Sequence, residues 1–80
     1  MSRDDKIIQK MKQSPRNVRF EEVDRFLKGR GFEVTRPGRG GSHYTYRRAD
    51  GLKITVARPH GGKKTVNVNT VEQVLEALEL

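Results

Sequence analysis

His43 has the sequence setting of a residue that could carry out acid–base chemistry on a phosphodiester. It follows a Gly-Arg-Gly-Gly loop at residues 38–41, and the backbone amides of such a loop can approach a phosphate closely. An imidazole with a pKa of about 6.5 can act as base or acid at neutral pH. RNA offers a matching substrate, because its 2′-hydroxyl can attack the adjacent phosphate once a base removes the proton. This chemistry needs no metal and no other cofactor.

Basic side chains around His43 could stabilise the negative charge that gathers in the pentacoordinate intermediate of this reaction. The candidates are Arg39, Arg47 and Lys53. A second glycine-rich basic loop, residues 58–64, adds His60, Lys63 and Lys64 as candidate contacts to RNA phosphates. An exposed histidine among cations can equally be an ordinary surface residue, so this pattern alone leaves both interpretations open.

Other arrangements of functional residues do not fit the sequence. Residues 38–41 spell the G-x-x-G of KH domains, but here they join two strands rather than two helices. The spacing of a P-loop is absent, and His43 and His60 have no third ligand at a metal-binding spacing. Tyr44 and Tyr46 could stack on bases, but their period matches the buried face of a strand, which favours core packing.

Helical periodicity marks three segments of the chain. Ile7, Ile8 and Met11 predict a short helix or a mobile arm within residues 4–13, before the break at residues 14–17. A second helix begins near Phe20 and ends at Gly29 or Gly31, with Gly31 as the left-handed residue after it. The last helix is expected from about residue 70 to the end. Two alternative capping boxes would open it: Thr70 with Gln73, or Asn69 with Glu72.

Between the second and last helices, the period of the apolar residues changes to two. Strands are expected at residues 32–35, 42–49 and 52–57, with Asp50-Gly51 as the turn of a hairpin. One face of this meander is apolar and the other is polar. The apolar face consists of Phe32, Val34, Tyr44, Tyr46, Leu52, Ile54 and Val56, and the opposite face carries His43, Thr45, Arg47, Lys53 and Thr55.

Two amphipathic helices and a sheet with one apolar face predict a two-layer α+β sandwich, with both helices on that face. The order of elements is helix, three antiparallel strands, helix, which is the architecture of the double-stranded-RNA-binding domain. Residues 18–80 form this domain in our interpretation, and residues 1–17 are an N-terminal extension.

Composition points to an anionic partner for this small domain. The 80 residues carry a net charge of +7, and the excess is greatest over residues 32–64, which have eight basic and two acidic side chains. Residues 65–80 carry three glutamates and no basic residue. The absence of cysteine, of an apolar span and of a secretory leader agrees with a cytoplasmic protein. Nucleic acid is the partner that this charge favours.

The sequence resembles the HicA family of toxin mRNA interferases over residues 18–80. The matching elements are Val18-Arg19-Phe20-Glu21-Glu22-Val23, Leu27, Gly31-Phe32-Glu33, Gly41-Ser42-His43-Tyr44, Tyr46, Pro59-His60-Gly61, and Thr70-Val71 through Leu78. The resemblance implies a fold like that of the double-stranded-RNA-binding domain, cleavage of mRNA without a metal, and inhibition by a HicB-like antitoxin. It also implies that His43 is the active histidine, with Gly41 and Ser42 as its neighbours. His60 matches a second histidine of the family, and we group it with the RNA contacts.

Two features depart from the family pattern, and two other functions remain open. Residues 1–17 precede the start of short family members, so they could be a docking arm, a helix covering the sheet, or a dispensable tail. The loop before Ser42 is rich in arginine and glycine. A non-catalytic RNA-binding module on the same fold is the main alternative to a ribonuclease. A DNA-binding protein ranks last, because no predicted helix is rich in exposed Arg, Asn and Gln. The oligomeric state stays undetermined.

Overall fold

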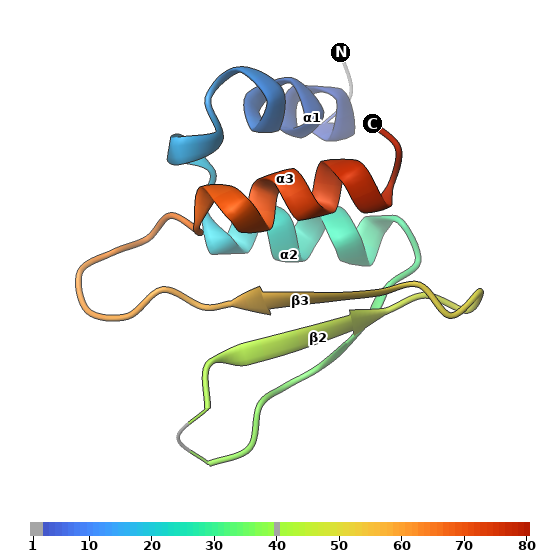
Figure 1. The fold of residues 1–80 in the computed structure, drawn as a ribbon, viewed down its shortest axis with the longest axis vertical. Coiled ribbons are helices and arrows are strands. Elements are labelled where there is room, and N and C mark those ends of the chain that lie inside the picture. The colour runs from blue at the N-terminus through green and yellow to red at the C-terminus, as the bar shows by residue number, and fades with distance from the viewer. Residues whose placement is uncertain (1–2, 40) are drawn as a thin grey trace.

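The computed structural model describes residues 3–39 and 41–80, and it has the predicted α+β architecture. A three-stranded antiparallel sheet carries two helices on one face, and a further helix lies on top of those two (Figure 1). The elements in chain order are α1 (Arg3–Gln13), the 3₁₀ turn η1 (Pro15–Asn17), α2 (Phe20–Gly29), β1 (Glu33–Thr35), β2 (His43–Arg47), β3 (Lys53–Ala57) and α3 (Val68–Ala77). None of the helices in the described residues has the length and apolar character that a membrane crossing requires.

The helix α2 forms because its apolar side chains share one face, as its periodicity predicts. Phe20, Val23, Phe26 and Leu27 are all buried. The helix ends as expected. Its C-cap is Arg30, and the next residue, Gly31, has a φ of +89°. A side chain is strained in that left-handed conformation, so glycine stops the helix and turns the chain into β1.

The strands form a meander in the order β1-β2-β3. Thr45 of β2 lies opposite Thr35 on one side and Thr55 on the other, which fixes the register of all three strands. The hairpin between β2 and β3 occurs at the predicted dipeptide. Gly51 has φ of +96° and its N–H donates to Arg48 O at 2.9 Å, while Arg48 N–H donates to Leu52 O at 2.9 Å. The regular strands are shorter than predicted, because residue 48 already belongs to this turn.

The hydrophobic core lies between the sheet and the layer of α2 and α3. Tyr46, Ile54 and Val56 are fully buried, and Phe32 is buried just before β1 begins. The hydroxyl of Tyr46 donates a hydrogen bond to Asp24 Oδ1 at 2.7 Å, which satisfies the polar group at the edge of the core. Burial is the largest cause of the raised pKa of Tyr46, and this hydrogen bond raises the pKa further. The predicted apolar face is therefore the face that the helices cover.

The start of α3 differs from the prediction. The helix begins at Val68, and its N-cap is Asn67, whose side-chain oxygen accepts a hydrogen bond from Asn69 N–H at 2.8 Å. Neither predicted capping box forms the start, because residues 69 and 70 already lie inside the helix. Asparagine is a strong N-cap residue, and its side chain here satisfies one of the unpaired amides of the first turn.

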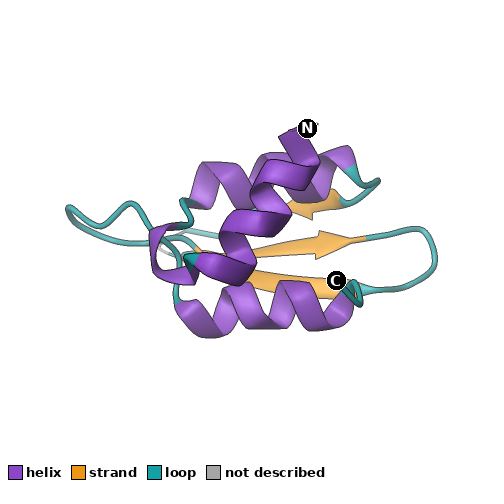
Figure 2. Ribbon diagram, turned by 90° about the horizontal axis from the view of Figure 1, so that it is seen from above, coloured by secondary structure: helices purple, strands orange, loops and turns teal. Residues whose placement is uncertain are grey.

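The N-terminal segment is a helix that packs on the helical layer and not on the sheet. Figure 2 shows α1 crossing above the other helices, on the side away from the strands. Met11 is 1% exposed and joins the core, and Ile7 and Ile8 pack against it. Lys10 Nζ donates to both carboxylate oxygens of Glu22, at 2.8 and 3.1 Å. The idea of a helix covering the sheet is thus wrong: α1 leaves the polar sheet face open.

Glu22 links α1 to the first turn of α2. Besides its pair with Lys10, its Oε1 accepts a hydrogen bond from Arg19 N–H at 2.9 Å, just before the helix begins. Partial burial raises the pKa of Glu22, but the hydrogen bonds from Lys10 and from Arg19 N–H outweigh it and hold the pKa below its usual value. The carboxylate therefore stays charged where both the α2 dipole and the lysine favour it.

Candidate functional site

A tight turn places His43 at the start of β2. Gly41 N–H donates to Gly38 O at 3.0 Å, which brings the two ends of this loop together. A Cβ atom on Gly41 would lie 2.9 Å from Pro37 Cβ and 3.3 Å from Gly38 O. A rigid proline ring and a backbone oxygen cannot easily give way, so this close approach requires glycine at position 41. Arg39 is exposed in the same loop, and residue 40 lies outside the described residues.

The strand ladder then fixes the direction of the His43 side chain. His43 pairs with Ala57 of β3, and Arg58 N–H donates to Ser42 O at 2.8 Å just beyond that pair. Since Tyr44 and Tyr46 face the helices, alternation along the strand directs His43 to the opposite, open face. His43 is exposed and Ser42 partly exposed. The imidazole is therefore accessible to a large ligand lying on the sheet.

The open sheet face carries a second group of cations at its other end. Arg47 and Lys53 are exposed and lie directly opposite each other. Like charges in this arrangement destabilise a sheet, but Glu33 of β1 lies opposite Arg47 on its other side and offsets part of the repulsion. Four residues separate Arg47 from His43, which is about 14 Å along an extended strand. The register thus brings Arg47 and Lys53 together but keeps them a strand's length from His43.

Arg58 is a residue of this region that the sequence analysis did not select. Its guanidinium lies 5.2 Å from the centre of the Phe20 ring, and Nη1 donates to the Tyr44 hydroxyl at 3.3 Å. That hydrogen bond raises the pKa of Arg58. Alternation could have placed it, because Ile54, Val56 and Arg58 continue one face of β3. Arg58 anchors the end of β3 to α2, so its side chain is directed to the helices rather than to the open face.

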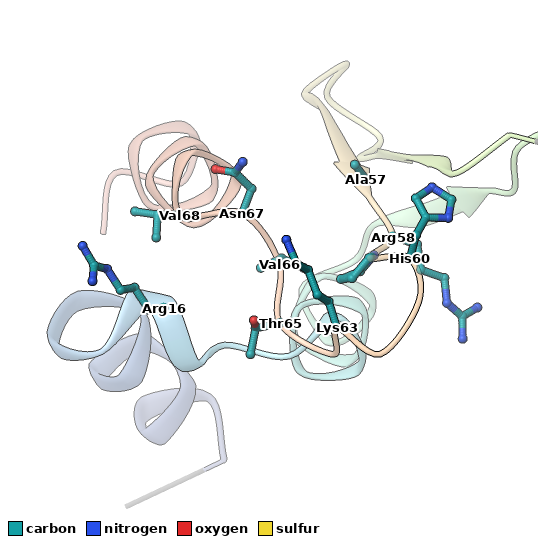
Figure 3. A pocket seen from close by; sticks show the side chains of 10 residues that line it. Arg16, Ala57, Arg58, His60, Lys63, Thr65, Val66, Asn67 and Val68 are labelled. Atoms are coloured by element: carbon teal, nitrogen blue, oxygen red, sulfur yellow. The ribbon is translucent and has the colours of Figure 1, made fainter.

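The two adjacent lysines of the second basic loop line different hollows. Lys63 lines a groove of about 630 Å³, and Lys64 lines another hollow with residues of α1 and α2. We call the first hollow the Arg16 groove, because Arg16 of η1 lies on one side of it while Lys63 and His60 lie on the other (Figure 3). Its lining consists of Arg16, Ala57, Arg58, Pro59, His60, Lys63, Thr65, Val66, Asn67 and Val68.

The ion pairs of the molecule gather on the helices. Within residues 3–39 and 41–80, three of the four salt bridges join side chains of α1, α2 or the residue after α2: Lys10–Glu22 at 2.8 Å, Lys28–Asp24 at 3.0 Å and Arg30–Asp4 at 3.9 Å. The fourth, Arg48–Asp50, lies in the hairpin. In the described chain, none of the predicted phosphate contacts takes part in a salt bridge. The positive charge of the sheet face and basic loops is thus not neutralised by salt bridges within the described residues, and Glu33 is the acidic cross-strand neighbour of Arg47.

Comparison with known proteins agrees with this architecture. A family model described as the HicA toxin of bacterial toxin–antitoxin systems matches residues 20–80, which leaves residues 1–19, with α1 and η1, outside the match. Comparisons with curated proteins and with solved structures returned no match. A family of this kind implies that the chain is the toxin of a toxin–antitoxin pair and has an antitoxin as its partner. The match extends over most of the chain, and the protein therefore belongs to the HicA toxin family.

Proposed function

We propose that this toxin is an endoribonuclease that cleaves mRNA without a metal, with His43 as the general base or acid. The observation that carries the proposal is the position of His43. It is exposed on the open sheet face, directly after a turn in which glycine is required, and at the end of the sheet where one basic loop leads into β2 and the other follows β3. Membership of a toxin family supports an activity that stops growth, and the positive surface supports an RNA substrate.

In the proposed reaction, the His43 imidazole removes the proton from a ribose 2′-hydroxyl. The 2′-oxygen then forms a bond to the adjacent phosphorus, and the bond from phosphorus to the 5′-oxygen breaks. The departing 5′-oxygen takes up a proton from the imidazolium or from water. The products are a 2′,3′-cyclic phosphate and a free 5′-hydroxyl. General base catalysis of this kind contributes about 10²- to 10⁴-fold to a rate.

The other residues take up positions along the RNA strand in this proposal. Arg39 and the backbone N–H of Ser42 lie in the loop before His43, so they would contact the reacting phosphate. Gly41 would let the phosphate approach closely, since its own N–H already donates to Gly38 O. Arg47 and Lys53 would hold a more distant phosphate, because of their separation of about 14 Å from His43 along β2. On the other side of the site, His60, Lys63 and Lys64 belong to the loop that follows β3.

Substitution of His43 tests the proposal. Because His43 is exposed, His43→Ala should leave the fold and the thermal melting temperature unchanged while cleavage of RNA and growth arrest are lost. His60→Ala provides a comparison at the other histidine, and it should weaken binding of RNA while cleavage at saturating RNA persists. The wild-type chain should cleave RNA in excess EDTA. Cleavage by His43→Ala, or its loss in EDTA, would contradict this assignment.

One observation favours a non-catalytic RNA-binding module instead. Among the described residues, no side chain forms a hydrogen bond with His43 that would orient its imidazole, whereas a catalytic base is commonly oriented by a third group. Under this alternative the chain would bind RNA, and expression would neither cleave RNA nor stop growth. An assay of purified protein on labelled RNA, with binding and cleavage read from the same samples, separates the two functions.

We also propose that a HicB-like antitoxin inhibits the toxin by covering the open sheet face around His43. The unpaired cations on this face suit acidic groups on the partner. Co-expression with the product of the neighbouring gene should give a complex that co-purifies and does not cleave RNA. A complex that leaves cleavage unchanged would show that the antitoxin binds elsewhere.

A further inference from the structure

The Arg16 groove borders the end of the sheet at which His43 is exposed, and His43 itself does not line it. Its walls come from the N-terminal extension, through Arg16, and from the loop between β3 and α3 (Figure 3). The family match begins at Phe20, so Arg16 precedes the matched region. The groove therefore combines residues of the family domain with one that this chain adds in front of it.

The chemical character of the lining is that of a site for an anion with an apolar part. Arg16, His60 and Lys63 provide cationic or proton-donating groups, and the described residues that line the groove include no acidic side chain. None of these three side chains forms a salt bridge within the part of the chain that the structure describes. Pro59, Val68 and the buried Val66 add apolar surface beside the charges. A phosphate joined to a sugar and base would find both kinds of contact here.

The groove continues from the candidate active site. Ala57 lines the groove and is also the cross-strand partner of His43. The next residue, Arg58, lines it as well and donates its backbone N–H to Ser42 O. A polynucleotide strand that passes His43 at this end of the sheet would reach the groove over Ala57 and Arg58. This continuity favours an RNA strand over a separate protein segment as the occupant.

Backbone hydrogen bonds hold the two walls of the Arg16 groove together. Phe20 N–H donates to Lys64 O at 3.2 Å, and Val66 N–H donates to Val18 O at 2.9 Å. These bonds surround the bridge between Arg19 and Thr65, so the end of the loop is fastened to the segment just after η1. On the other side of η1, Ser14 N–H donates to Lys10 O at 2.7 Å, which joins the turn to α1.

We propose that the Arg16 groove binds a phosphodiester of single-stranded RNA that flanks the cleaved bond, with Arg16 and Lys63 on opposite sides of the strand. The inference rests on the proposed ribonuclease function and extends it to a second contact region. Arg16 is a binding residue in this arrangement and does not touch the reacting phosphate. The N-terminal extension thus takes part in holding the substrate.

The test measures binding of a short, fully 2′-O-methylated RNA, which lacks the attacking hydroxyl and stays intact whether or not the protein is a nuclease. The affinity of the full chain is followed as the salt concentration is varied. Each phosphate contact on a single strand contributes about 0.7 to the slope of log K against log salt, so Arg16→Ala should reduce the slope by about that amount. Affinity should fall about five-fold at about 0.1 M salt, with the difference vanishing near 1 M.

Arg25→Ala is the matched control, because Arg25 is exposed on α2 and does not line the groove. It should leave the slope of the wild-type chain unchanged, whereas Arg16→Lys should retain most of the contact that Arg16→Ala removes. Arg16→Ala and Lys63→Ala should be less than additive when combined, since both act on one phosphate. Equal slopes for Arg16→Ala and Arg25→Ala would overturn the proposal.

The outcomes also separate this inference from the proposed function. If RNA binding depends on Arg16 but the unmodified RNA is never cleaved, RNA binding by the groove is supported and the nuclease function is refuted. If cleavage depends on His43 while Arg16→Ala binds RNA as the wild type does, the nuclease function is supported and RNA binding by the groove is refuted. If Arg16→Ala weakens only the complex with the antitoxin, the groove belongs to a protein partner and the RNA assignment is overturned.

Discussion

Replacement of Met11 by alanine tests whether α1 is an integral part of this domain. Met11 is 1% exposed and belongs to the same core cluster as Val18, Val71 and Val74. It is the buried residue of α1, so the docking of that helix depends heavily on it. The change to alanine removes the Cγ, Sδ and Cε atoms and retains a residue with high helix propensity. The effect therefore reports packing rather than helix formation.

The size of the effect follows from burial. Three buried groups at about 0.8 kcal/mol each give about 2.4 kcal/mol of lost transfer free energy. A residual cavity raises the cost, and measured Met→Ala changes in cores span about 2–5 kcal/mol. Because α1 forms the outermost layer and can shift inward, we expect about 2–3 kcal/mol. An 80-residue domain has a total stability of about 4–12 kcal/mol, so this loss is a large fraction of it.

Thermal and urea denaturation of the full chain measure this loss. At about 4–8 °C per kcal/mol for a domain of this size, the melting temperature should fall by about 10–20 °C. Lys12→Ala is the control, because Lys12 is the exposed neighbour of Met11 and its replacement should change stability by less than about 0.5 kcal/mol. Equal stabilities of the two variants would refute the reasoning and show that α1 does not belong to the cooperative core.

The further predictions concern hydrogen bonds made by the side chains of Tyr46, Asn67 and Arg48. Tyr46→Phe removes the bond to Asp24 and should cost about 1.5–3 kcal/mol in urea denaturation. Because burial and that bond raise the folded-state pKa of Tyr46, the contribution of Tyr46 to wild-type stability should be constant below about pH 10 and be lost as the pH rises above it, and this part of the decline should be absent from Tyr46→Phe. Asn67→Ala should cost about 1 kcal/mol through loss of the α3 cap, and an unchanged melting temperature would contradict that role. Arg48 donates two hydrogen bonds to Asp50, and this pairing is the main cause that lowers the pKa of Asp50 to about 2. Titration of its carboxyl signal by NMR should therefore show the value rising toward about 4 in Arg48→Ala.

Local chemistry allowed much of this fold to be predicted from the sequence. The stripe from Phe20 to Leu27 and the glycine at position 31 specified α2 and its end, because helix period and left-handed φ are properties of a few adjacent residues. The alternation that put Tyr46 inside likewise put His43 outside. The position of His43 on an open, positive sheet face follows from the same local pattern, and its catalytic role stays a prediction.

The start of α3 was mispredicted because several residues competed for one role. Asn67, Asn69 and Thr70 are all good cap residues, and the pattern of apolar residues does not choose among them. The choice is made by tertiary packing: Val66 is buried and its N–H donates to Val18 O, so the chain is still extended at residue 66. The cap can then follow immediately, at Asn67. Local sequence patterns do not predict that residue 66 pairs with residue 18, which lies almost fifty positions earlier in the chain.

The same long-range pairing explains why sequence analysis separated residues that the fold joins. Arg16 lies in a short segment with no periodic pattern, and Lys63 belongs to a loop whose glycines suggest mobility. The bonds between residues 18–20 and 64–66 bring both segments to one groove. Conversely, Lys63 and Lys64 are adjacent in sequence but line different hollows, because the backbone of Lys64 is already bound to Phe20. The net charge predicts an anionic ligand, and that ligand stays a prediction. The groove itself could not be predicted, because it depends on the pairing of residues 18–20 with residues 64–66.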